Sequence, residues 1–161
     1  MQVTDMLEVN CIKVPLEAVE KYQAITELLD LLREQGKLDD YDTVLKAIME
    51  REAVRSTGVG QGFAIPHAKL SAVKQMVMAL GKPTEPIDFQ SIDGKPVTIV
   101  ILLLSPADRT GPHIQALARI SRMMTEARFR EQLWSCSSAQ QLHEYIVAYE
   151  QRESAAIDND S

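Results

Sequence analysis

Cysteine is scarce in this sequence. Only two cysteines, Cys11 and Cys136, occur among the 161 residues, far apart and without a CxxC pair. Disulfide-stabilised domains and cysteine-based zinc sites need several closely spaced cysteines, so the pattern excludes both as the main architecture. We expect the two thiols to be reduced and to serve as packing residues.

A long apolar run and a secretory signal are also absent. The longest apolar stretch, 97–104, is interrupted by one threonine and is far shorter than the about 20 residues needed to cross a bilayer. Residues 1–9 contain two acidic side chains and no basic one, unlike the start of a signal peptide. We therefore expect a cytoplasmic protein without direct membrane insertion.

An excess of basic residues is missing as well. Seventeen Lys and Arg stand against 23 Asp and Glu, which gives a net charge of −6 and a pI near 5.1. A nucleic-acid-binding protein needs a basic face to displace counterions from phosphates, so we expect no nucleic acid among the partners. The acidic balance is compatible with a basic protein partner, but the ordinary requirement for solubility is the preferred explanation.

Apolar residues recur at helical spacing in four segments. The glycine at Gly36 is expected to end the first helix, and Asp39 or Asp40 to cap the second. Ser138 and Gln141 form a capping box that opens the last one. The four segments are 25–32, 41–48, 113–124 and 138–149.

Short apolar runs between these segments indicate strands. The stretch 97–104 is apolar on both faces, which is typical of a central strand covered by helices on both sides. The pattern therefore predicts one α/β or α+β domain, a mixed β-sheet flanked by helices on both faces. We expect it to cover residues 5–148, with a polar, disordered tail over 149–161. The other strand candidates are 8–14, 63–65 and 76–80.

The unusual segment is a glycine-rich loop ahead of a histidine. Gly58, Gly60 and Gly62 fall within five residues and are followed by Pro66 and His67. Glycine-rich backbone can present amide groups to an anion, but this spacing matches no dinucleotide or P-loop motif and by itself favours a tight turn or bulged hairpin. Proline lacks an N–H, so we expect the chain to leave regular strand geometry there and to place His67 at the rim of the sheet.

A second histidine and two arginines accompany this loop. His113 follows the buried strand and opens the next helix, and ligand crevices commonly form beyond the carboxyl ends of strands, so we expect it to converge on His67. Arg51 and Arg55 end the second helix, where they either satisfy terminal carbonyls or present a guanidinium to a phosphoryl group. His143 lies inside the last helix and is assigned no role.

The segment Arg51-Glu52-x-x-x-Ser56-Thr57-Gly58-Val59-Gly60-x-Gly62-x-Ala64-Ile65-Pro66-His67 resembles the signature of type-2 enzyme IIA domains. These domains form the fructose, mannitol and nitrogen-regulatory group of the phosphoenolpyruvate-dependent phosphotransferase system. The resemblance continues through the turn at 92–97, the strand ending in Leu104-Ser105-Pro106 and the helix that carries His113, and covers roughly residues 5 to 148.

The resemblance implies a phosphotransferase component that forms a phosphohistidine. His67 would accept a phosphoryl group from the histidine phosphocarrier protein and pass it to a IIB component for sugar uptake, with His113 beside it. Transfer of this kind depends on donors and positioning, and no cofactor or metal is implied. We expect the phosphate-binding residues to be Arg51, Thr57, Gly58 and Gly60.

Two departures from the family pattern concern the partner. The loop before His113 is rich in turn residues and contains Arg109, which could contact phosphate or a partner, and Phe63 replaces a small aliphatic residue.

The main alternative function is a nitrogen-regulatory enzyme IIA that signals by phosphorylation-dependent binding of a regulatory target protein. One alternative of another class is a metal-binding protein that uses His67 and His113, although a metal site usually has three or four ligands. Another is an interaction domain without catalytic chemistry. The sugar, the downstream acceptor and the oligomeric state stay open.

Overall fold

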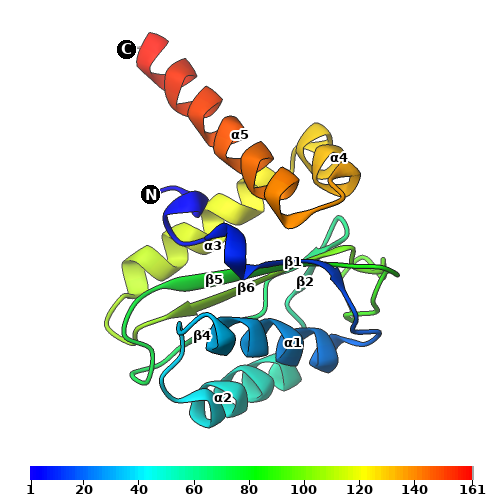
Figure 1. Ribbon diagram of the computed structural model, residues 1–161, viewed down its shortest axis with the longest axis vertical. Coiled ribbons are helices and arrows are strands. Elements are labelled where there is room, and N and C mark those ends of the chain that lie inside the picture. The colour runs from blue at the N-terminus through cyan, green and yellow to red at the C-terminus, as the bar shows by residue number, and fades with distance from the viewer. Residues whose placement is uncertain (161) are drawn as a thin grey trace.

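Strand β6, Ile99–Ser105, forms the centre of the fold, and all seven of its side chains are buried. Its isoleucine, valine and leucine side chains suit a strand that is covered on both faces. The structure is a computed structural model in which residues 1–160 are described, and helices lie on both sides of this strand (Figure 1).

The other strands are β1 Ile12–Leu16, β2 Gly58–Gly60, β3 Phe63–Ala64, β4 His67–Lys69 and β5 Val77–Pro83. They form one mixed sheet in the order β1-β5-β6-β3-β2, with β4 also paired to β6. Strand β5 is antiparallel to one edge of β6, whereas β3 and β4 follow one another along its other edge, both parallel to it. Strand β1 is parallel to β5, and β2 is antiparallel to β3.

The helices are α1 Lys21–Glu34, α2 Tyr41–Val54, α3 Thr110–Met124, α4 Ala127–Ser135 and α5 Ala139–Asn159, with 3-10 turns at Val3–Asp5 and Val9–Cys11. Helices α1 and α2 cover one face of the sheet, and α3, α4 and α5 lie on the other (Figure 1). Within residues 1–160, no helix is both long enough and apolar enough to cross a bilayer. The predicted mixed sheet with helices on both faces, in a single domain, is confirmed.

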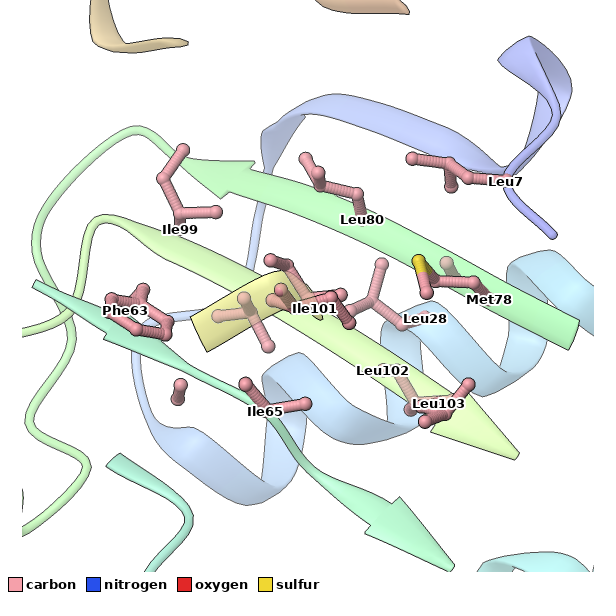
Figure 2. Packing of buried hydrophobic residues seen from close by; sticks show 14 of the residues in the cluster. Leu7, Leu28, Phe63, Ile65, Met78, Leu80, Ile99, Ile101, Leu102 and Leu103 are labelled. Atoms are coloured by element: carbon pink, nitrogen blue, oxygen red, sulfur yellow. The ribbon is translucent and has the colours of Figure 1, made fainter. Parts of the chain in front are cut away.

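Apolar side chains from the helices and the N-terminal segment meet on the central strands. Leu7, Leu28 of α1, Met78 and Leu102 are among the side chains of the packed interior (Figure 2), and all four are at most 1% exposed. Burying a side chain of this size contributes about 1.5–3 kcal/mol. The core therefore lies along β5 and β6 and holds both of them in place.

Local sequence signals fixed several helix ends as predicted. Gly36 adopts a φ of +71° after α1, and the Asp40 side chain accepts a hydrogen bond from the Thr43 amide at the start of α2. Ser138 caps α5 by accepting from the Gln141 backbone amide, but the side-chain Oε1 of Gln141 accepts from Ser137 instead of closing the box on Ser138. Helix α4 and strands β2 and β4 were not predicted, since each is short or contains glycine or a charged residue.

The predicted disordered tail over 149–161 is wrong for residues 149–159, which continue α5. The reason is a buried carboxylate that composition does not reveal. Glu150 is 1% exposed and accepts hydrogen bonds from the amides of Val3 at 2.8 Å and Thr4 at 3.0 Å. It also pairs with Arg119 of α3 at 3.0 Å, so this part of α5 joins the N-terminal segment to the domain. Ser161 lies outside the described residues.

Truncation tests this role of α5. A chain ending at Ala148 loses Glu150 and leaves Arg119 without that carboxylate, so we expect the free energy of unfolding to fall by about 3 kcal/mol or more. A chain ending at Ser154 keeps the contacts and removes residues whose described members are exposed, and should change stability by less than about 0.5 kcal/mol. Urea unfolding measures both, and equal stability of the two truncated chains would contradict the anchoring role.

Candidate functional site

His67 opens β4 at the edge of the sheet. It lies opposite Leu103 of β6, and among the described strands β4 pairs with β6 alone. Pro66 interrupts the run between β3 and β4, but its carbonyl still accepts a hydrogen bond from the Leu103 amide at 3.0 Å. The predicted rim position of His67 is therefore confirmed, and the proline separates two short strands without detaching the chain from β6.

His113 reaches the same place from the first turn of α3. The two imidazole rings have their centroids 5.5 Å apart and are tilted by 53°. His113 is 8% exposed, and His67 is half-buried. The expected convergence of the two histidines is confirmed, because β6 carries the chain from beside His67 into the loop and helix that hold His113.

Each ring is held through its Nδ1 atom, but the two partners differ. Nδ1 of His67 lies 2.7 Å from the Ile65 carbonyl oxygen, which can only accept. The proton of a neutral His67 ring is therefore assigned to Nδ1, and Nε2 keeps its lone pair. Nδ1 of His113 lies 2.7 Å from the hydroxyl of Ser105, the last residue of β6, and a hydroxyl can donate or accept.

Burial keeps both rings neutral. Desolvation is the main cause that lowers the pKa of His67, assisted by the Arg51 charge, while the bonded Ile65 carbonyl and Glu52 oppose it. The pKa of His113 is also lowered, first by burial and then by the charges of His67 and Lys69. A neutral imidazole with a free Nε2 lone pair is the nucleophilic form, so His67 is prepared for covalent chemistry near neutral pH.

Arg51 supplies positive charge at the site and is tied to the backbone. Its guanidinium donates a hydrogen bond to the Arg55 carbonyl at 3.1 Å, across the end of α2. That contact is the helix-terminal role considered from the sequence, and the Arg51 charge also helps to lower the pKa of His67. The guanidinium retains further N–H groups for an anion. The side chains of Arg55 and Arg109 are exposed.

A buried network beneath the site involves Thr57 and Glu52. The Glu52 carboxylate is 2% exposed and accepts from both the Thr57 amide, at 3.1 Å, and the Thr57 hydroxyl, at 2.6 Å. Lys21 lies 3.6 Å from the same carboxylate and donates to Gln90 at 3.0 Å. Because both donors of Thr57 are engaged by Glu52, Thr57 links α2 to β2 and has no free donor for a phosphoryl group.

The glycines predicted to bind phosphate do not gather at His67. Gly60 pairs with Phe63, which is opposite Ile99, whereas His67 is opposite Leu103. Four strand residues separate these registers, which corresponds to about 13 Å. The register therefore contradicts the predicted role of Gly60, which has a φ of +96° in the β2–β3 turn.

Gly58 has a packing function in place of the predicted one. Its amide donates to the Ser56 hydroxyl at 3.0 Å, so this donor is already used. A Cβ atom at Gly58 would come within 2.3 Å of the Ser91 Oγ and 3.1 Å of the Phe89 Cβ. The absence of a side chain therefore lets the loop around Phe89–Ser91 pack closely against β2, as the alternative of a structural hairpin suggested.

Sequence reasoning missed a lysine that lies on the same face of β4 as His67. Lys69 is two residues further along the strand, and its ammonium group donates to the Thr110 hydroxyl at 2.6 Å. Thr110 and His113 are one turn apart on α3, so two contacts cross from β4 to α3, His67 to His113 and Lys69 to Thr110. Alternation along a strand after Pro66 could have pointed to Lys69. From the sequence, Ser105 was recognised only as part of the strand end that matches the family pattern.

A metal site is not assembled from these residues. Across residues 1–160, no group of three or more His, Cys, Asp or Glu side chains is arranged to hold a metal ion. His67 and His113 bring two ring nitrogens together, and a protein zinc site usually has three or four ligands. The cluster of histidines, Arg51 and Lys69 combines a nucleophile with positive charge and hydrogen-bond donors, which suits a transferring anionic group.

Comparison with known proteins relates residues 5–149 to one family model, described as "Phosphoenolpyruvate-dependent sugar phosphotransferase system, EIIA 2". The fructose-specific EIIA component of Haloferax volcanii is 37% identical over 91% of this chain and 97% of its own length. The fructose-specific EIIABC component of Bacillus subtilis is 35% identical over 86% of this chain, which spans 22% of that longer relative.

Solved structures show the same fold. The nitrogen regulatory protein IIA-Ntr from Neisseria meningitidis has a TM-score of 0.83 at 32% identity and covers 89% of this chain and 98% of its own. A complex of enzyme IIAMTL and phosphorylated enzyme IIBMTL from Escherichia coli contains a chain with a TM-score of 0.75 at 19% identity, covering 88% of this chain and 97% of its own.

The lowered pKa values of the two site histidines predict how stability depends on pH. An unfolded histidine takes up a proton near its ordinary pKa of 6.5, whereas His67 and His113 resist protonation in the fold. Their contribution to stability is therefore complete above pH 6.5 and is lost as the pH falls through the lowered folded values. Chemical unfolding between pH 7.5 and pH 5 measures this loss. The free energy of unfolding should decline less for the double variant His67→Gln/His113→Gln than for the wild type. His143→Gln controls for the loss of an imidazole, and an identical decline in the double variant would contradict the assignment.

Proposed function

The chain belongs to the EIIA type-2 family of the phosphoenolpyruvate-dependent sugar phosphotransferase system, and on that basis we propose that it carries a phosphoryl group on Nε2 of His67. The family is made up of phosphotransferase components, which carry phosphoryl groups between proteins of the system. The observation that supports His67 as the carrier is its hydrogen bond to the Ile65 carbonyl, which leaves Nε2 as the free nucleophilic atom beside a second, buried histidine.

The proposed donor is the histidine phosphocarrier protein, and the transfer balances without moving a proton. The Nε2 lone pair of His67 attacks the phosphorus atom and forms the new P–N bond. The P–N bond of the donor breaks, and its electron pair stays on the donor imidazole. Each ring keeps the proton on its other nitrogen, so the phosphorylated His67 ring becomes positively charged and its Nδ1–H bond to Ile65 becomes charge-assisted.

The transferring group carries negative charge on its oxygens and needs donors more than it needs acid or base catalysis. The His113 ring lies 5.5 Å from the His67 ring, and we assign it to a phosphoryl oxygen. Arg51 contributes the charge that already acts on His67. Lys69 contributes a second positive charge on the same strand face, where its one hydrogen-bond partner among the described residues is the neutral Thr110 hydroxyl. Such donors stabilise the transition state without reorganisation.

The proposed acceptor is a IIB component for sugar uptake. Support comes from the likeness to fructose-specific EIIA proteins and from a fold relative solved in complex with a phosphorylated enzyme IIB. A second function, nitrogen regulation through phosphorylation-dependent binding of a target protein, is supported by the likeness to IIA-Ntr at a TM-score of 0.83. Both functions use the same phosphohistidine and differ in the protein that binds it.

Phosphorylation in a purified system tests the carrier role. The chain is incubated with phosphoenolpyruvate, enzyme I and the histidine phosphocarrier protein, and intact mass is measured for wild type, His67→Ala and His143→Ala. We expect one acid-labile phosphoryl group on the wild type and on the His143 variant, which changes a half-buried ring on α5, and none on the His67 variant. A His67→Ala protein that is still phosphorylated would overturn the assignment of the carrier atom.

Charge removal at Lys69 tests its part in holding the phosphoryl group. We expect Lys69→Met to lower the rate of transfer to the site about tenfold, the scale of one lost hydrogen bond to a charged group. The matched control is Lys74→Met, which removes an exposed lysine paired with Asp39 at 3.4 Å. Rates come from quench-flow with the phosphocarrier as donor. Equal rates for the two methionine variants would show that Lys69 does not help to hold the phosphoryl group.

A further inference from the structure

Ser105 is the last residue of β6 and is completely buried. Its hydroxyl lies 2.7 Å from Nδ1 of His113 and has no other hydrogen-bond partner in the part of the chain that the structure describes. The backbone carbonyl of Ser105 accepts from the Leu70 amide at 3.0 Å, which fixes the serine at the junction of β4 and β6. The hydroxyl is therefore aimed at one ring nitrogen only.

Two proton arrangements fit this contact, and they differ in what they leave unsatisfied. If Nδ1 of His113 carried the proton, it would donate to Ser105, and the serine hydrogen would be buried without an acceptor. If Ser105 donates to Nδ1, the serine hydrogen and the ring nitrogen are both satisfied, and the ring proton stays on Nε2. Leaving a buried donor without a partner costs about 1–3 kcal/mol, so the second arrangement dominates.

We propose that Ser105 is a positioning residue that holds neutral His113 in the tautomer with its proton on Nε2, so that this N–H donates to the phosphoryl group on His67. The tautomer part rests only on the Ser105 contact, and the catalytic part rests on the proposed carrier function.

The two histidines then form a complementary pair. His67 faces a carbonyl, which fixes its proton on Nδ1 and frees the Nε2 lone pair. His113 faces a hydroxyl that has no other acceptor, which fixes its proton on Nε2 and makes that atom a donor. Burial lowers the pKa of both rings and keeps both neutral, so the choice of tautomer decides which ring attacks and which ring donates.

Nitrogen-15 NMR reads the tautomers directly in the unphosphorylated chain. In the wild type, the two-bond coupling pattern of His113 should show Nε2 protonated and Nδ1 unprotonated, and His67 should show the reverse. In Ser105→Ala, His113 should lose this preference and populate both tautomers, while His67 keeps its own. A wild-type His113 protonated on Nδ1, or a tautomer unchanged by Ser105→Ala, would overturn the proposal.

Transfer kinetics test the catalytic part through a double-mutant cycle. We expect Ser105→Ala to slow phosphoryl transfer from the phosphocarrier about tenfold, and to slow it no further in a His113→Ala background, because the serine acts through that ring. A tenfold effect that persists without His113 would identify a merely structural role. Circular dichroism and urea unfolding confirm that each variant is folded. Failure of the wild type to accept a phosphoryl group would refute the carrier function, while the NMR result would still decide the tautomer.

Discussion

The hydrogen-bond ladder along β6 is the constraint on which the site depends. A strand buried on both faces has a strongly specified register, because a slip by one residue would move every side chain to the opposite face. That register sets His67 opposite Leu103 and Lys69 opposite Ser105. The chain then leaves β6 at Ser105 and returns as α3, which brings His113 back over the edge strand. Core packing thus fixes the distance between the two imidazoles, although neither ring belongs to the core cluster.

Two identical side chains become chemically different through the single atom that each ring faces. The low exposure of the pair keeps both rings neutral, and a neutral imidazole must place its one proton on one nitrogen. The Ile65 carbonyl can only accept, so the proton of His67 is on Nδ1. The Ser105 hydroxyl has no other acceptor within residues 1–160, so it donates to Nδ1 of His113 and the proton of that ring is on Nε2. The surrounding positive charges of Arg51 and Lys69 reinforce neutrality and suit a dianionic group. A backbone carbonyl beside one ring and a serine hydroxyl beside the other therefore set the different roles of the two histidines.

Local patterns predicted much of this molecule, and long-range register explains most of what they missed. Helical spacing located α1, α2, α3 and the start of α5, and the doubly apolar run at 97–104 located the central strand. The role expected of Gly60 failed because spacing along the chain does not show that the turn lies at the other end of β6. The contacts of Ser105 with His113 and of Glu52 with Thr57 are local, eight and five residues apart, and were missed because each joins a strand or loop residue to a helix outside any regular spacing. The helical end of α5 was hidden by a polar composition in which Glu150 is buried.

The hydrogen bonds that hold the two histidines are buried or partly buried, whereas the neighbouring helix turns carry exposed side chains. Nucleophile, tautomer and charge are set by groups at the end of β6, and the chain is similar both to a fructose-specific EIIA component and to a nitrogen regulatory IIA protein. Exposed side chains surround these groups on the last turn of α2 and the first turns of α3, including Val54 at 85% and Ile114 at 59% exposure. Apolar side chains at this exposure cost little in the free chain and gain contact area only when a protein docks. Substitutions at the exposed Val54 and Ile114 should therefore leave the hydrogen bonds of the two histidines intact, whereas substitutions at those hydrogen bonds should act on the transfer step.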